Sequence, residues 1–284
     1  MFRINYVCFN ITSKCNMTCP YCYRAGNTTG SVSLSQAKKY IDFLIQHGCD
    51  TINITGGEPL LNPAWKDIVK YCIEKGLFVI ISTNGLLLDL DDEILNHINV
   101  LSLPLDGGSE NVNSRTRSKG HFEKIHKLLE KYKSSDYPFK IKINTVLTRY
   151  NYDTLNDILL LLNDPKVVWK IFELREKGEF YNFPIENTIS FQEANRCISL
   201  IDTLKHSCSI YYMGKHADNS QKYSVNPNYI VLNYNGDIYL ATENEDKLLF
   251  NIDSGEPVEA LSAKDMGALN NQYREELMKD FKRY

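Results

Sequence analysis

Short runs of apolar and β-branched residues alternate with longer amphipathic segments along the first 175 residues of the chain. The segments between the runs predict helices, and their apolar positions recur at helical spacing. Several of the runs are apolar at nearly every position, as expected for parallel strands that are covered on both faces. The runs lie at residues 4–12, 51–55, 77–83, 99–105, 140–147 and 167–174, and the predicted helices at 33–47, 63–75, 90–97, 120–133 and 153–162.

This alternation predicts six strand–helix units whose parallel strands are joined by right-handed crossovers. We therefore expect an α/β fold, a partial (β/α)6 barrel over residues 1–208, since a complete eight-stranded barrel needs more chain. Residues 209–284 are expected to form a small C-terminal α+β extension. Its predicted elements are a β-hairpin around Asn235-Gly236 and a terminal helix from near Val258 to Lys279.

The composition is that of a soluble globular protein, with 43% apolar and 24% charged residues, which provides enough apolar side chains for a large core. A net charge of -3, without blocks of like charge, creates no overall field for polymeric nucleic acid or for a membrane surface. No run of 18 apolar residues occurs. We expect a cytoplasmic protein that binds neither membranes nor polymeric nucleic acid.

The chain contains eight cysteines, too few for a disulfide scaffold in a protein of this length. Three of them lie close together in a polar, turn-rich stretch directly after the first predicted strand, at the spacing CxxxCxxC. These are Cys15, Cys19 and Cys22. The scattered ones are Cys8, Cys49, Cys72, Cys197 and Cys208, and scattered cysteines are most often small buried apolar side chains.

The cysteine cluster allows four interpretations. A structural zinc site requires four ligands, and no second pair lies downstream. A redox pair of Cys19 and Cys22 leaves Cys15 without a role, and burial in a core does not suit so polar a stretch. An iron–sulfur cluster held by three thiolates leaves one iron open for chemistry. The cysteines follow the end of a predicted barrel strand, where catalytic groups are expected, and this position favours the iron–sulfur interpretation.

With Tyr21 directly before the last cysteine, the CxxxCxxC stretch resembles that of the radical S-adenosylmethionine superfamily. The resemblance implies a 4Fe-4S cluster on Cys15, Cys19 and Cys22, whose open iron chelates the amino and carboxylate groups of S-adenosylmethionine. It also implies an enzyme that reductively cleaves S-adenosylmethionine to a 5'-deoxyadenosyl radical and abstracts a hydrogen atom from its substrate. A reducing partner such as flavodoxin or ferredoxin would supply the electron.

Three later motifs carry the resemblance further, each at the end of a predicted strand. "GGEP" resembles the superfamily motif that holds the amino group of S-adenosylmethionine, "ISTNG" the strand that contacts its ribose, and "PLDG" the stretch that precedes a carboxylate-binding arginine. Arg115 is the second choice for that arginine. The cofactor-binding residues implied by the resemblance are Tyr21, Gly56, Gly57, Glu58, Pro59, Ser82, Asn84, Asp106 and Arg117.

Lysines on the fifth and sixth predicted strands indicate the substrate. Alternation places Lys140, Lys142 and Asn144 on one face of the fifth strand, and Lys170 lies within the otherwise apolar sixth. A lysine inside a barrel is costly unless it meets an anion such as a phosphate or carboxylate.

The same two strands resemble those of the viperin-like nucleotide dehydratases, lyases that convert CTP to its 3'-deoxy-3',4'-didehydro form. The resemblance implies that Lys142, Asn144 and Lys170 bind the substrate phosphates. The shared pattern extends to Arg149, Asn151, Trp169 and Phe172. The substrate would then be a small molecule such as a nucleoside triphosphate.

Two departures from this pattern remove positive charge, because Thr51 and Val168 stand where that family has a lysine and an arginine. Fewer cations imply weaker phosphate binding or a less charged substrate. One alternative is modification of a ribosomal peptide, for example an epimerase that uses Cys197 or Cys208 as hydrogen donor. The chain has too few cysteines after residue 72 for the additional-cluster domain of many peptide maturases. Another small-molecule reaction is the remaining alternative.

Overall fold

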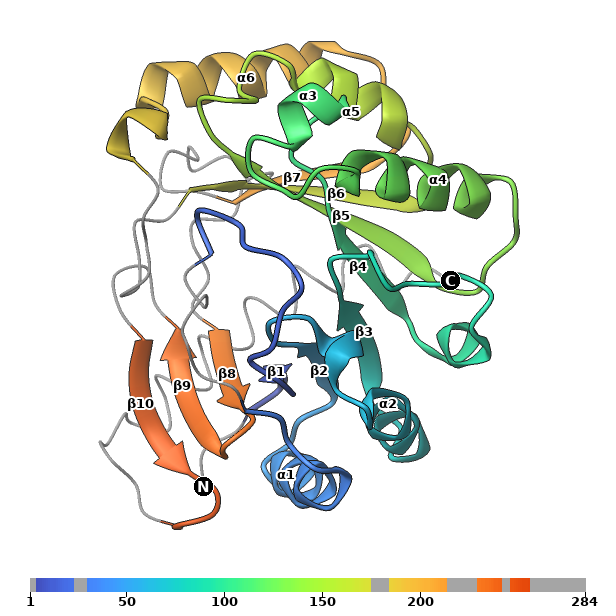
Figure 1. The fold of residues 1–284 in the computed structure, drawn as a ribbon, viewed down its shortest axis with the longest axis vertical. Helices are drawn as coiled ribbons and strands as arrows, with labels where there is room; N and C mark the ends of the chain where they lie inside the picture. The colour runs from blue at the N-terminus through green and yellow to red at the C-terminus, as the bar shows by residue number, and fades with distance from the viewer. Residues whose placement is uncertain (1–3, 23–29, 175–183, 214–228, 242–245, 256–284) are drawn as a thin grey trace.

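The computed structural model of this chain describes residues 4–22, 30–174, 184–213, 229–241 and 246–255. One curved ten-stranded sheet organises them, in the order β10-β9-β8-β1-β2-β3-β4-β5-β6-β7, with helices along its outer side (Figure 1). The strands are β1 (Tyr6–Asn10), β2 (Thr51–Thr55), β3 (Phe78–Ser82), β4 (Val100–Pro104), β5 (Lys140–Leu147), β6 (Val167–Glu173), β7 (Ser209–Met213), β8 (Tyr229–Asn233), β9 (Asp237–Ala241) and β10 (Asp246–Asn251).

Most helices follow the predicted alternation with the strands. Helix α1 begins after Ser33, whose hydroxyl accepts the backbone N–H of Gln36 in a capping box. The helices are α1 (Leu34–Gln46), α2 (Trp65–Glu74), α3 (Glu110–Asn113), α4 (His121–Lys133), α5 (Leu155–Leu162) and α6 (Phe191–Thr203), and the 3₁₀ turns are η1 (Pro59–Leu61), η2 (Glu93–His97) and η3 (Ile185–Asn187).

All six predicted strands are present, and the α/β partial-barrel fold is confirmed. The predicted helix at 90–97 is wrong, because only the 3₁₀ turn η2 forms there. The Asp89 and Asp92 side chains accept the backbone N–H groups of Asp91 and Ile94, and such local turns compete with helical hydrogen bonding in the first half of the segment. The predicted terminal helix at 258–279 lies outside the described residues.

The sheet is larger than six strands. Strand β7 pairs in parallel with β6, and β8 pairs in parallel with β1 at the other side of the parallel block. The hairpin predicted at Asn235-Gly236 joins β8 to β9, and Gly236 adopts the left-handed conformation with φ +86°. Strands on both sides of residue 208 thus belong to one sheet, and the division of the chain there stays a proposal.

The two faces of the sheet differ in character. The outer face packs against the helices in the main hydrophobic core, whereas the inner face carries a smaller apolar cluster of Tyr6, Ile80, Val100 and Met213. Because β1 to β7 are parallel, the loops after their carboxyl ends meet at one edge, where ligands of open α/β sheets bind. Within the described part of the chain, no helix has the length and apolarity needed to cross a membrane.

Candidate active site

The cluster loop, residues 11–22, follows β1 at this edge and carries the three clustered cysteines. Cys15 is exposed, Cys19 and Cys22 are partly buried, and all three are free thiols. The backbone N–H of Cys22 donates to the Cys19 carbonyl at 3.0 Å, which forms a turn between them. Burial raises the pKa of the Cys15 and Cys19 thiols, and coordination to a metal would deprotonate them.

These donors fit an iron–sulfur cluster better than a zinc ion. Among the described residues, no three His, Cys, Asp or Glu side chains are grouped so that they could hold one metal ion. In an iron–sulfur cluster each thiolate binds a different iron, so the thiols need not converge on one point. Three such thiolates would leave one iron of a four-iron cluster open for a ligand.

Gly56 and Gly57 let the end of β2 approach the cluster loop. Gly56 has φ +147°, and a Cβ there would lie 2.2 Å from the Thr12 carbonyl oxygen. A Cβ on Gly57 would lie 2.3 Å from the Lys14 carbonyl oxygen. The N–H of Gly57 donates to the Thr12 carbonyl at 2.8 Å. The two glycines therefore seat the loop directly on the strand end, which larger residues would prevent.

Glu58 is completely buried and holds neighbouring segments together. Its carboxylate accepts hydrogen bonds from the Thr83 hydroxyl at 2.6 Å, the Asn84 N–H at 2.7 Å and the Leu60 N–H at 3.1 Å. Pro59, also buried, begins η1 directly afterwards. A ligand ammonium would have to share a carboxylate that already accepts three bonds, so Glu58 shapes the loop in this structure.

The end of β3 also contacts the cluster loop. The Asn84 amide donates to the Asn16 side chain at 2.7 Å, between the first two cluster cysteines. Ser82 has a different position, because its hydroxyl donates to Asn53 at 2.8 Å on the inner face of the sheet. Of these two predicted cofactor residues, Asn84 is the one that reaches the cluster loop.

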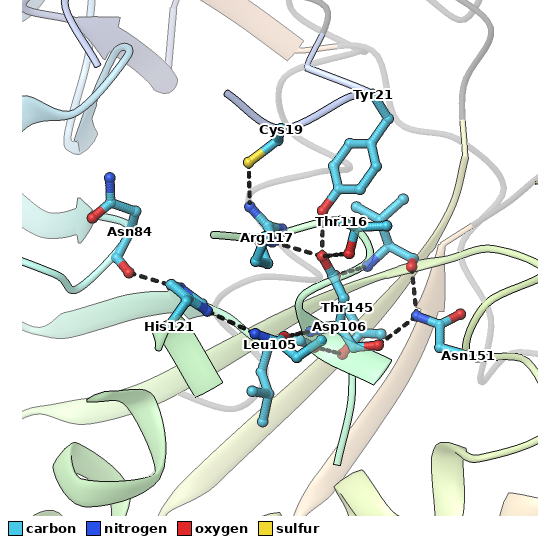
Figure 2. Close-up of polar contacts among 12 residues, drawn as sticks. Cys19, Tyr21, Asn84, Leu105, Asp106, Thr116, Arg117, His121, Thr145 and Asn151 are labelled. Carbon is cyan, nitrogen blue, oxygen red and sulfur yellow. Dashed lines mark hydrogen bonds and ion pairs between the residues drawn. The ribbon is translucent and has the colours of Figure 1, made fainter. Parts of the chain in front are cut away.

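Asp106, at the end of β4, is the centre of a buried network (Figure 2). Its carboxylate accepts from the Arg117 Nε at 2.6 Å, from the Thr116 hydroxyl at 3.0 Å and from the Tyr21 hydroxyl. Arg117 also donates to the Cys19 Sγ at 3.4 Å and leaves other N–H groups of its guanidinium for a ligand. Arg115 is exposed and lies over the ring of Tyr150, which favours Arg117 as the arginine of this site.

Three residues that the sequence did not single out as site residues complete the network. His121 and Asn113 link the end of β3 to the end of β4 and are buried. Asn151 donates to the Asp106 and Val146 carbonyls, so its role in this structure is to fix the strand ends. His121 reaches Asn84 and Asn151 reaches Asp106 through contacts distant in sequence, and of the three residues Asn151 is the one that the strand pattern in the sequence included.

The predicted substrate residues lie on the inner face. Lys142 and Lys170 are each 3% exposed, and the positive charge of Lys170 helps to lower the pKa of Lys142. Asn144 donates to the Ser102 hydroxyl at 3.0 Å, and its side-chain oxygen is buried with no hydrogen-bond partner among the residues that the structure describes. Cys8 is close enough to Lys142 to interact with it electrostatically, and its sulfur lies 3.3 Å from the Tyr6 hydroxyl.

Other members of the substrate pattern lie elsewhere. Arg149 is exposed and makes a two-pronged ion pair with Glu193 at 2.8 and 3.0 Å. Trp169 belongs to the outer core, where its indole N–H donates to Thr145 at 2.8 Å. The structure thus brings Lys142, Asn144 and Lys170 together on the inner face and places Arg149 outside.

A model of the Radical SAM superfamily matches residues 9–162. The match covers more than half of the chain, which therefore belongs to this superfamily and is an enzyme. Members use a 4Fe-4S cluster and S-adenosylmethionine, and these are its cofactors. The matched segment contains the cluster loop and the ends of β2, β3 and β4 described above.

Curated relatives carry different activities. The chain is 28% identical over 182 residues to the AdoMet-dependent heme synthase of Methanosarcina barkeri, covering 61% of this chain and 51% of that protein. It is 29% identical over 189 residues to an S-adenosylmethionine-dependent nucleotide dehydratase of Selenomonas ruminantium, covering 61% and 66%. The chain therefore spans about half to two thirds of the length of these relatives.

Among solved structures, SuiB of Streptococcus suis bound to its precursor peptide SuiA is similar in fold. The TM-score is 0.70 at 16% identity, over 84% of this chain and 59% of that one. This likeness supports the partial-barrel fold.

Proposed function

We propose that this radical SAM enzyme acts on an anionic nucleotide and removes water from its ribose to give a 3'-deoxy-3',4'-didehydro product. The observation that carries the proposal is Lys142, a buried lysine on the inner face of β5. No hydrogen bond or ion pair reaches its ammonium from the part of the chain that the structure describes.

Charge and burial together favour an anionic substrate. Burial, and then the charge of Lys170, lowers the pKa of Lys142 from 10.5 to about 7. The buried Lys142 ammonium loses hydration and is repelled by the charge of Lys170, a cost that a phosphate beside Lys142 would offset. The nucleotide dehydratase of Selenomonas ruminantium among the relatives supports this choice of anion.

The departures from the viperin-like pattern limit the charge of the substrate. Thr51 is buried, and its hydroxyl donates to the Asp50 side chain at 2.8 Å. Val168 is 2% exposed and apolar. Neither side chain carries the positive charge that would bind a phosphate. We therefore propose that the site prefers a nucleotide with fewer phosphates than a triphosphate.

The proposed cofactor site lies at the carboxyl ends of β1 to β4. S-adenosylmethionine on the cluster would supply a 5'-deoxyadenosyl radical that abstracts hydrogen from the substrate. Gly56 and Gly57 bring the backbone close enough to bind its amino group, and Asn84 lies beside the cluster loop for polar contacts. Arg117, held by Asp106, offers guanidinium N–H groups to its carboxylate.

Peptide modification is the second candidate, and one observation favours it. Cys197 and Cys208 both pack in the outer core, and Cys197 donates to the Tyr152 carbonyl. Neither cysteine therefore lies on the inner face. Cys8 does lie there, beside Lys142, where its thiol could return a hydrogen atom to a substrate radical. This location would suit an epimerase in which Cys8, in place of the two later cysteines, is the donor.

The experiment measures 5'-deoxyadenosine release by anaerobically reconstituted enzyme with dithionite and S-adenosylmethionine. CTP, UTP, GTP and the matching monophosphates are added in turn, and the correct nucleotide should accelerate release at least tenfold. Lys142→Met should abolish this acceleration, whereas Lys127→Met on the exposed side of α4 should not. Absence of stimulation by every nucleotide would refute the nucleotide proposal.

Two further assignments belong to the same proposal. The enzyme is proposed to be cytoplasmic, and a flavodoxin or ferredoxin to reduce its cluster. Replacing dithionite by a reduced flavodoxin in the same assay tests the second assignment. Cluster reduction should be seen by EPR if the assignment holds.

A further inference from the structure

His121 is a buried titratable residue that the proposed chemistry does not use. It is the first residue of α4, is completely buried, and has hydrogen bonds at both ring nitrogens. Its Nε2 lies 3.0 Å from the Asn84 carbonyl oxygen (Figure 2). Its Nδ1 lies 3.0 Å from the Asn113 Nδ2. Neither of these side-chain hydrogen bonds caps the N-terminus of α4, so they serve another purpose than starting the helix.

Backbone groups at both ends fix the direction of this chain of hydrogen bonds. The Asn84 carbonyl can only accept, so the Nε2 of His121 carries the proton and its Nδ1 is an acceptor. The Asn113 amide nitrogen donates to that Nδ1, and the Asn113 oxygen accepts the Asp106 N–H at 2.9 Å. The relay therefore runs in one direction, from the Asp106 backbone through Asn113 and His121 to the Asn84 backbone.

The two ends of the relay flank the cluster loop. At one end, the Asn84 side chain donates to Asn16 of the loop. At the other end, Asp106 holds Arg117, which contacts Cys19 of the loop. A long connection joins β3 to β4, so the covalent chain by itself does not fix the distance between the Asn84–Asn16 contact and the Arg117–Cys19 contact.

We infer that His121, acting with Asn113, is a positioning residue that sets the spacing between the Asn84 and Asp106–Arg117 contacts to S-adenosylmethionine. The inference rests on the proposed cofactor roles of Asn84 and Arg117. The relay requires a neutral imidazole, because an N–H on Nδ1 would point at the N–H groups of Asn113. Burial, and then the charge of Arg117, lowers the pKa of His121 to about 4, which keeps the ring neutral at physiological pH.

The two ring nitrogens can be tested separately. His121→Asn places a polar atom near Nδ1 and can preserve the bond to Asn113, while His121→Gln can preserve the bond to Asn84. His121→Phe removes both bonds and keeps a ring of similar size. Tyr132→Phe is the control, because it removes a buried hydrogen bond to the Phe139 carbonyl from the same helix, away from the cluster loop.

The readouts are the Kd for S-adenosylmethionine by calorimetry on anaerobic holoenzyme and the change in the EPR spectrum of the reduced cluster when S-adenosylmethionine is added. His121→Phe should weaken binding about tenfold, as expected for one or two buried hydrogen bonds, and should alter the EPR change. His121→Asn and His121→Gln should each recover part of the affinity. Adding Asn113→Leu to His121→Phe should cost little more than either change alone.

The outcomes separate this inference from the proposed site. If Arg117→Ala and Asn84→Ala weaken binding while His121→Phe lowers only the stability to urea, as Tyr132→Phe does, the positioning role is refuted. If Arg117→Ala and Asn84→Ala leave the Kd unchanged, the proposed cofactor contacts are wrong, and the relay has no contacts to position. The positioning role is supported if His121→Phe loses affinity for S-adenosylmethionine and His121→Asn and His121→Gln each recover part of it.

Discussion

The Lys142→Met variant should be more stable than the parent protein when no substrate is bound. Methionine fills a similar volume with a flexible apolar side chain and removes a buried charge. The pKa of Lys142 falls from 10.5 in the unfolded chain to about 7 in the folded protein. At about 1.4 kcal/mol per pKa unit, this shift costs the parent fold about 4 kcal/mol at pH 7, which methionine would recover.

The sign of the pH dependence follows from proton binding. Between pH 7 and 10.5 the unfolded chain holds the Lys142 proton more tightly than the folded one, so the stability of the parent rises with pH. The advantage of Lys142→Met is therefore largest at pH 7 and below, and shrinks by about 1.4 kcal/mol per unit as the pH rises above 7.

Urea denaturation of cluster-free protein under anaerobic conditions at pH 7, 8 and 9 measures this difference. Lys127→Met on the exposed face of α4 is the control and should change stability little at any of these values. A Lys142→Met variant that is less stable than the parent at pH 7, or whose advantage does not change with pH, would refute the reasoning. It would mean that Lys142 is already neutralised by a partner in the substrate-free protein.

Three other predictions concern the cofactor site. Gly57→Ala should lower the iron content after reconstitution, because the alanine Cβ would lie 2.3 Å from the Lys14 carbonyl oxygen. The control Gly76→Asn should leave the iron content unchanged, because no described atom lies within 4 Å of a Cβ at that position. Equal iron contents in the two variants would contradict the close-approach explanation. Asp106→Asn leaves Arg117 without its buried carboxylate and should cost about 3–5 kcal/mol in urea denaturation, together with weaker binding of S-adenosylmethionine in calorimetry; a loss below 1 kcal/mol would show that the pair is dispensable. Alanine at Cys15, Cys19 or Cys22 should abolish the brown visible chromophore of the cluster. Alanine at Cys197 or Cys208 should leave the chromophore unchanged.

The sequence determined the local elements and the kind of chemistry. Apolar runs of strand length and the Ser33 capping box fix strands and helices through contacts between residues close in sequence. The cysteine spacing likewise acts within a few residues, whereas the glycine pair shows in the sequence as a motif but acts against Thr12 and Lys14 of the distant cluster loop. Because parallel strands end at the same edge, the order of the motifs along the chain predicted that they would meet there.

The tertiary structure decided which side chains are available for ligands. Glu58 looks like a cofactor ligand in the sequence, yet its carboxylate is filled by Thr83, Asn84 and Leu60. Arg149 belongs to the strand pattern shared with the nucleotide dehydratases, yet it pairs with Glu193 of α6. Whether a polar group is already satisfied depends on residues brought together by the sheet, and a local pattern carries no record of them.

The same limit explains what was missed. His121 carries no motif, and its role exists only because the ends of β3 and β4 lie on either side of it. Cys8 reads as an ordinary buried cysteine until the curvature of the sheet places it beside Lys142. The sequence determined strands, helices and cofactor chemistry through short-range periodicity and spacing, whereas only the assembly of the strands into one curved sheet decided the partners of each polar side chain.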